Sequence, residues 1–121
     1  MLLNLLKAKL HRATVTGCDL DYEGSLRLDP ELMERASILP FEFIQVYNIN
    51  TGARFETYAI SGERGSRECV LNGAAARLAC RGDLVIIVAL CSLTPEEARE
   101  HRPRIVLLGE GNVIKEVAGE A

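Results

Sequence analysis

The sequence predicts a mainly β fold with short helices, arranged as a small β-barrel. Three observations favour it: the segments between turn-forming residues are short, several have strand-like composition, and strands and helices do not alternate regularly. The chain has 121 residues, of which 48% are apolar, which is enough for a buried core. We therefore expect one domain that spans residues 1–121.

The first half of the chain is expected to hold three strands and one helix. The strand-like segments are residues 10–16, 43–48 and 54–60. The turn residues Asn50-Thr51-Gly52 predict that the second and third form a hairpin. Asp29 and Pro30 start the helix, because Asp caps free N–H groups and Pro fits a first turn, and this helix should end before Pro40.

The second half is expected to alternate between short helices and strands. Residues 72–80 are rich in Ala and permit a helix. Residues 84–90 are uninterruptedly apolar, which indicates a strand buried on both faces. Thr94 caps a second short helix, and residues 104–108 form a further strand. The polar tail after Gly109 is expected to fray.

Composition argues against several classes of protein. The net charge is −3 and there is no Trp, so a nucleic-acid partner is not expected. The longest apolar run, residues 84–91, is too short to span a membrane, and no signal peptide is visible, so we expect a cytoplasmic protein. The four Cys form no C-x-x-C pair and only two His are present, so neither a metal site nor disulfides are expected.

Gly24-Ser25 is the candidate reactive position, although such a pair alone is more typical of a turn. Its setting favours function, because five separated blocks resemble, in order and spacing, the pyruvoyl-dependent aspartate 1-decarboxylase family. These blocks are residues 9–12 with Asp19 and 22–25, residues 50–60, residues 63–67, residues 72–76 and residues 82–87. The resemblance covers nearly the whole chain.

The resemblance implies a six-stranded double-psi β-barrel that assembles as a homotetramer, with active sites at the subunit interfaces. It also implies self-cleavage between Gly24 and Ser25 into a β chain, residues 1–24, and an α chain, residues 25–121. Ser25 would become a covalent pyruvoyl group, which supplies the carbonyl that decarboxylation of an amino acid needs. Through a Schiff base the enzyme would convert L-aspartate to β-alanine and CO2, for pantothenate and coenzyme A synthesis. A maturation factor is a further candidate partner.

Family roles then fall on particular residues, each of which also has an ordinary structural interpretation. Thr57 would assist cleavage and contact the substrate, and Tyr58 would donate a proton, since a phenol keeps its proton at neutral pH. Without the resemblance, both are ordinary strand residues. The other substrate-binding candidates are Lys9, His11, Arg54, Asn72, Gly73, Ala74 and Ala75, with Tyr22 a weaker one. A guanidinium suits a carboxylate, so Arg54 favours an acidic substrate.

Some positions depart from the family pattern. Tyr47 stands where a Trp is common, and Gly17-Cys18 and residues 68–71 also differ. Two other functions stay open from the sequence. One is a non-catalytic β-barrel that binds a small molecule or a partner, with Ser25 in a plain turn. The other is a pyruvoyl enzyme that acts on a different amino acid.

Overall fold

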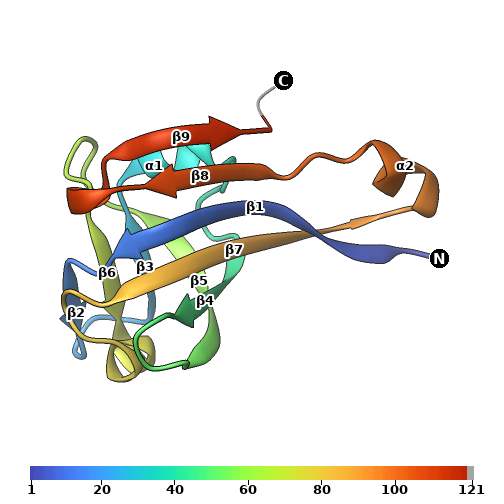
Figure 1. Cartoon of the computed structure of the whole chain (residues 1–121). Helices are drawn as coiled ribbons and strands as arrows, with labels where there is room; N and C mark the ends of the chain where they lie inside the picture. The colour runs from blue at the N-terminus through green and yellow to red at the C-terminus, as the bar shows by residue number, and fades with distance from the viewer. Residues whose placement is uncertain (120–121) are drawn as a thin grey trace.

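The computed structural model describes residues 1–119 and is mainly β with short helices, as predicted (Figure 1). The strands are β1 (Leu3–Thr14), β2 (Gly17–Asp19), β3 (Ser25–Leu28), β4 (Phe43–Asn48), β5 (Arg54–Ser61), β6 (Cys69–Asn72), β7 (Leu84–Leu93), β8 (Arg104–Leu108) and β9 (Ile114–Ala118). The helices are α1 (Pro30–Arg35), α2 (Pro95–Glu100) and the 3-10 helices η1 (Gly73–Leu78) and η2 (Glu110–Asn112).

All nine strands belong to one sheet with the order β2-β6-β3-β5-β4-β7-β1-β8-β9. Two sets of hydrogen bonds connect the chain at β1 with the chain at β6, although these strands are far apart in the strand order. Thr16 N donates to Cys69 O at 2.8 Å, and the buried Asn112 amide bonds both Thr14 and Arg67 O. The six strands from β6 to β1 therefore curl around the core as in a small barrel, although no strand pairing between β1 and β6 closes it within residues 1–119.

The core fills the inside of this curled sheet and is wholly aliphatic in its largest members. Its largest fully buried side chains are Leu10, Leu26, Leu28, Leu32, Met33, Ile44, Leu71, Ile87, Val15, Val46, Val85 and Val106. Alternate residues of β1 and β4 point outward, as expected of strands with one buried face. The outward residues of β1, β4 and β5 form an outer face that carries several functional candidates.

Most of the predicted elements are confirmed. The Asp29 side chain accepts from Glu31 N at the start of α1, and Thr94 forms a full capping box on α2. The hairpin turn is also as predicted, because Gly52 adopts φ 79° and donates to Asn48 O at 2.8 Å. Phe43–Asn48 has the predicted bounds.

Four expectations need correction. The first strand begins earlier, at Leu3, because β7 pairs with it along its whole length. The Ala-rich segment forms a 3-10 helix that starts at Gly73 with a φ of 62°. In β7, Leu90 is 41% exposed and Ile86 half-buried, so one face is not fully covered. The tail beyond Gly109 forms η2 and β9, since β9 finds backbone partners on β8; residues 120–121 lie outside the described part.

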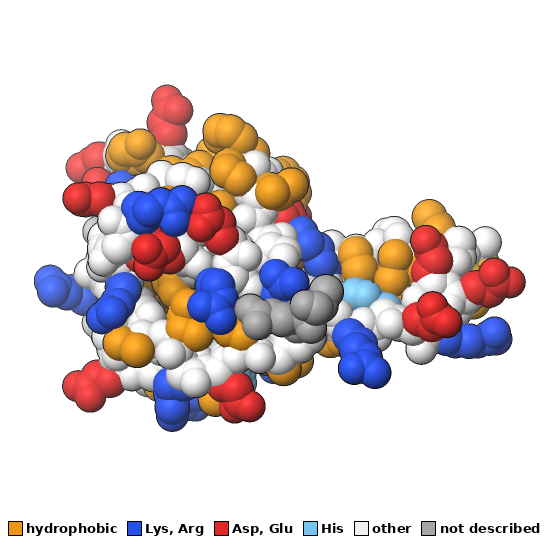
Figure 2. All heavy atoms as spheres, turned by 90° about the horizontal axis from the view of Figure 1, so that it is seen from above, with side chains coloured by type: hydrophobic (Ala, Val, Ile, Leu, Met, Phe, Trp, Pro, Cys, Tyr) orange, Lys and Arg blue, Asp and Glu red, His pale blue; other side chains and the backbone are white. Residues whose placement is uncertain are grey.

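An arm projects from the body of the molecule and consists of the start of β1, the end of β7 and α2 (Figures 1 and 2). His101 Nε2 lies 2.6 Å from Leu6 O and ties the end of α2 to β1. Exposed apolar side chains, including Leu2 and Leu90, lie on this arm. No helix within residues 1–119 is long and apolar enough to span a membrane.

Candidate active site

The Gly24-Ser25 junction lies between two strands that carry other candidate residues. Ser25 is the first residue of β3 and pairs with Asn72 on β6. On the other side, β3 runs parallel to β5, where Leu26 pairs with Ala59. When that register is continued by one residue, Ser25 lies alongside Tyr58. The sheet therefore gathers the junction, the end of β6 and the middle of β5, which we call the scissile site (Gly24, Ser25, Thr57, Tyr58, Asn72 and Gly73).

Ser25 has an unusual environment for a serine. It is fully buried, and its φ of 141° lies in a region that non-glycine residues rarely adopt. Such a backbone costs about 1–3 kcal/mol, so the surrounding strands must hold it. Its hydroxyl oxygen accepts a hydrogen bond from Asn72 Nδ2 at 3.5 Å, which is long for such a bond. The Ser25 hydroxyl is therefore held only by a long hydrogen bond, and the backbone that carries it is strained.

Asn72 presents a polar atom that has no protein partner. The residue is fully buried at the end of β6, and its Oδ1 atom makes no hydrogen bond within residues 1–119. A buried amide oxygen without a partner is costly, and such groups concentrate at functional sites. This oxygen is available to a ligand or reacting group at residue 25.

Thr57 and Tyr58 are adjacent on β5 and point to opposite faces. Thr57 is half-buried and pairs with the buried Ile44. Tyr58 pairs with Phe43, and the two rings stack with centroids 6.3 Å apart. Phe43 was not among the residues predicted for the site, and the register of the hairpin places it opposite Tyr58. The stack limits where the Tyr58 hydroxyl can point.

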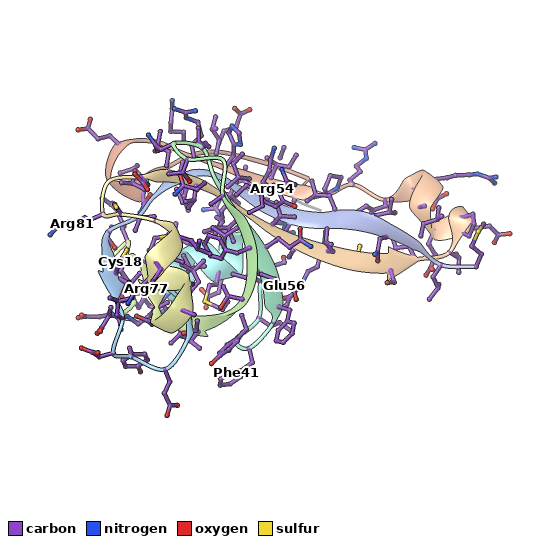
Figure 3. All side chains as sticks on the ribbon, turned by 90° about the horizontal axis from the view of Figure 1, so that it is seen from below. Cys18, Phe41, Arg54, Glu56, Arg77 and Arg81 are labelled. Atoms are coloured by element: carbon purple, nitrogen blue, oxygen red, sulfur yellow. The ribbon has the colours of Figure 1, made fainter. Side chains whose placement is uncertain are left out.

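Arg54 lies at the other end of β5, on the outer face. Its guanidinium carbon is 3.8 Å from the centre of the Tyr47 ring, in cation–π geometry. The Tyr47 hydroxyl donates to Gln45 Oε1 at 2.6 Å, which fixes the ring. Figure 3 shows Arg54 and Glu56 extending from the same strand. Tyr47 thus provides an aromatic surface at the position where the resemblance implies Trp, and it orients the exposed cation.

Lys9 and His11 lie on β1, also on the outer face, and line a hollow of about 220 Å³ with Leu107 and Glu116. A bulge follows them, where Arg12 adopts a φ of 67°. His11 Nδ1 is buried without a hydrogen-bond partner within residues 1–119. Burial, and then the charges of Lys9 and Arg12, lower the pKa of His11, which favours the neutral imidazole at pH 7.

The predicted residues therefore fall into two groups. The scissile site contains six of them, of which Tyr58 also points to the outer face, whereas Lys9, His11 and Arg54 lie on the outer face away from the junction. Strands β7, β4 and β5 separate β1 from β3 in the sheet, so one chain does not bring Lys9 next to Ser25 through strand pairing. Ala74 is exposed and Ala75 half-buried on η1, which begins beside the scissile site.

The other two departures from the predicted family pattern lie in or next to strands β2 and β6. Gly17 and Cys18 belong to β2, which pairs with β6, and Cys18 Sγ donates to Ala79 O at 3.4 Å. Figure 3 shows Cys18 beside η1, which carries Arg77. In the departing segment 68–71, Cys69 and Leu71 are buried in the core, and Glu68 forms an ion pair with Arg27. The only charged side chain in this segment, that of Glu68, is thus paired with Arg27.

The arrangement differs from that of a serine hydrolase. A hydrolytic serine needs an adjacent base, normally His. His11 is on the outer face and His101 is bonded to Leu6 O, so neither histidine serves Ser25 within this chain. Fold and site thus define a small, mainly β protein with a fully buried serine on a strained backbone.

Comparison with known proteins identifies the family. The family model described as aspartate decarboxylase matches residues 1–115, and the chain belongs to that family. A protein of Caulobacter vibrioides named aspartate 1-decarboxylase is 58% identical over 98% of this chain and 100% of its own length. One of Clostridium acetobutylicum with the same name is 57% identical, over 97% of this chain and 92% of its own length.

Proposed function

We propose that this chain is a self-processing, pyruvoyl-dependent aspartate 1-decarboxylase. It converts L-aspartate to β-alanine and CO2 and so supplies pantothenate and coenzyme A synthesis. The observation that carries the proposal is the buried, strained Ser25 next to Gly24, held between β5 and β6 in a chain of this family. A non-catalytic binding module does not require a strained backbone at a buried serine.

The first step of the proposal is cleavage of the chain by its own serine. The Ser25 oxygen attacks the Gly24 carbonyl carbon, the carbon–nitrogen bond breaks, and the hydroxyl proton passes to the freed nitrogen, which gives an ester. Removal of the Ser25 α-proton then expels the Gly24 carboxylate and leaves a dehydroalanine. Addition of water and loss of ammonia produce a pyruvoyl group on the α chain, residues 25–121, and free the β chain, residues 1–24.

The residues around position 25 fit such a group. Asn72 Oδ1 is buried and has no hydrogen-bond partner among residues 1–119, and Thr57 is on the neighbouring strand, where its hydroxyl can stabilise the developing oxyanion. The pyruvoyl carbonyl supplies an acceptor for the substrate amine and for the electrons that the departing carboxylate leaves behind. Tyr58 then delivers a proton to the former α-carbon, and Phe43 orients its ring.

The outer face supplies the positive charge that a dicarboxylate requires. Arg54 binds a carboxylate in bidentate fashion while its stack on Tyr47 limits its freedom. Lys9 adds a second cation, and the neutral His11 offers hydrogen bonds. Asn72, Gly73, Ala74 and Ala75 complete the proposed substrate-binding set at the start of η1. These cations make an acidic amino acid the expected substrate rather than a neutral one.

The separation of the two groups supports an assembly with active sites at subunit interfaces. A second copy can bring its outer face, with Lys9, His11 and Arg54, to the scissile site of the first. Large apolar side chains are exposed near Tyr58, including Phe41 and Phe43, which are 74% and 67% exposed. Figure 2 shows further apolar side chains along the projecting arm. A homotetramer would cover such surfaces.

Intact mass of the purified protein tests the proposal directly. We expect the wild-type chain to separate into residues 1–24 and residues 25–121, the latter with a terminal pyruvoyl mass. Ser25→Ala should fold but stay in one piece and lose all decarboxylation. A wild-type chain that stays uncleaved after prolonged warming, with or without cell extract to supply a maturation factor, would support the binding module instead.

Substrate choice is tested by CO2 release from aspartate, glutamate and neutral α-amino acids. We expect aspartate to be preferred strongly. Preference for another amino acid by the cleaved protein would keep the pyruvoyl chemistry and overturn the substrate. A cytoplasmic location and the absence of a metal requirement remain predictions, and activity in the presence of a chelator tests the latter.

A further inference from the structure

We propose that Gly73 is a positioning residue for self-cleavage, in addition to its expected place in the substrate pocket. Because it has no side chain, the Gly24 backbone can lie directly against the start of η1. This inference rests on the proposed function, since it concerns the same cleavage. It assigns to the start of η1 a role in forming the pyruvoyl group.

The contact between the two glycines carries the proposal. A Cβ atom added at Gly73 would lie 2.8 Å from Gly24 Cα, 2.9 Å from Gly24 N and 3.1 Å from Tyr22 O. All three are backbone atoms, so no change of rotamer can relieve the clash. By contrast, a Cβ at Gly62 or Gly109 would meet the flexible side chains of Glu68 or Lys115. A side chain at position 73 must therefore displace the segment that is to be cut.

Backbone conformation alone does not distinguish Gly73. Its φ is 62°, but Gly52, Gly65 and Gly111 also adopt positive φ values. At these three positions nothing lies within 4 Å of an added Cβ. Any L-residue at these positions has an unfavourable backbone conformation, but its Cβ contacts no atom of residues 1–119. What sets Gly73 apart is what it faces, the residue that contributes the scissile carbonyl.

Cleavage depends on this contact because Ser25 cannot follow a displaced Gly24. Ser25 is fully buried and pairs with Asn72, the residue next to Gly73. Its oxygen must come within about 3–3.5 Å of the Gly24 carbonyl carbon, and misplacement by about 1 Å can cost 100-fold in rate. A side chain on Gly73 would push Gly24 away from this geometry while β3 holds Ser25 in place.

The experiment compares Gly73→Ala with Gly111→Ala. The control is matched, because Gly111 has a φ of 67° and is exposed, with open space where its Cβ would lie. Both variants therefore carry the same conformational cost, and only one carries the clash. The cleavage rate is followed by intact mass from freshly purified precursor. We expect Gly73→Ala to cleave roughly 10- to 100-fold more slowly than wild type, and Gly111→Ala to cleave at close to the wild-type rate.

Two further measurements separate positioning from folding. Melting temperatures are measured for both substitutions in the uncleavable Ser25→Ala background, where we expect similar values. Gly73→Asn is added because Asn tolerates positive φ better than Ala yet still carries a Cβ; it should also cleave slowly.

Three results would overturn the inference: wild-type cleavage in Gly73→Ala, equal slowing in Gly111→Ala, or a melting temperature far lower for Gly73→Ala than for its control. Failure of the wild-type chain to cleave would instead contradict the proposed function itself.

Discussion

The scissile site and the outer face hold their functional residues in opposite ways. At the scissile site, Ser25 and Asn72 are fully buried, the Ser25 backbone is strained, and the Asn72 amide oxygen has no partner in the described part of the chain. On the outer face, Arg54 is exposed and gains its order from an aromatic ring rather than from burial. By the proposed function, the first region reacts with itself, whereas the second binds a ligand that arrives from solution.

This difference predicts that maturation and turnover are separable in one small domain. By the proposed mechanism, cleavage needs only groups that the sheet of one chain places together, around Gly24 and Ser25. By the same mechanism, turnover also needs the cations of the outer face. Strand order keeps Lys9 and His11 on β1 away from Ser25, and Arg54 lies four residues before Tyr58 on β5. Substitutions on the outer face should therefore spare cleavage, and each prediction below asks whether that division holds.

Tyr58→Phe gives the largest expected effect among these predictions. Tyr58 belongs to the scissile site by position but acts only in turnover by the proposed mechanism. We expect normal cleavage together with a kcat lower by about 100- to 10,000-fold, because a positioned proton donor contributes that much. Intact mass and CO2 release measure the two steps. Full activity would require another proton donor, and loss of cleavage would place Tyr58 in maturation too.

Arg54→Gln tests the outer face. The variant keeps length and polarity but removes the charge and the bidentate geometry. We expect unchanged cleavage and a kcat/KM for aspartate lower by about 10- to 100-fold, which corresponds to about 1.5–3 kcal/mol for a hydrogen bond to a charged group. Tyr47→Phe is the matched control, because it keeps the aromatic surface and loses only the bond to Gln45. Slow cleavage in Arg54→Gln would contradict the division.

Asp29→Asn tests whether a general loss of stability is enough to slow cleavage. The buried Asp29 carboxylate accepts from Glu31 N, Gly65 N and Arg67 N, at 2.8–3.1 Å. The variant should lose about 1–3 kcal/mol of unfolding free energy, because a donating amide group replaces one acceptor oxygen. Denaturant unfolding in the Ser25→Ala background measures this loss, and cleavage in the Ser25 protein should be unchanged.

The pH dependence of stability provides a second test of Asp29. Burial alone would raise the pKa of Asp29, but hydrogen bonds from three backbone N–H groups and the charge of Arg64 together lower it. The stabilisation from Asp29 is thus complete above the unfolded-state pKa of about 3.9 and is lost as pH falls through the lower folded-state value. Asp29→Asn should therefore lose less stability than the parent below about pH 4. If the parent and Asp29→Asn lost equal stability on acidification, the folded state would not stabilise the ionised form of Asp29.

Local signals predicted much of this structure. The caps at Asp29 and Thr94 and the hairpin turn at Gly52 follow from the chemistry of a few neighbouring residues. The short strands β2, β3 and β6 were missed, because three or four residues carry little pattern and their stability comes from pairing with distant segments. β9 was missed for the same reason, since its partner β8 determines that the tail forms a strand.

The candidate site was predicted through family motifs rather than through residue chemistry. No local pattern indicates that Ser25 is fully buried with a φ of 141°, because both follow from the pairing of β3 with β6. The Gly73–Gly24 contact is equally hidden, since it joins residues 49 positions apart in the sequence. The stack of Phe43 on Tyr58 could have been predicted, because the hairpin register fixes it.

His11→Gln has the smallest expected effect and concerns the charge state of the outer face. Burial and the nearby cations lower the pKa of His11, so as pH falls below about 6.5 the unfolded chain takes up a proton before the folded one. The folded state should therefore lose stability through that window, and His11→Gln should remove this part of the slope. Urea unfolding at several pH values between 5 and 7.5, in the Ser25→Ala background, measures it. If the parent instead gained stability on acidification, the imidazolium would be favoured in the folded chain, and Glu116, which lines the same hollow, would be the group to vary next.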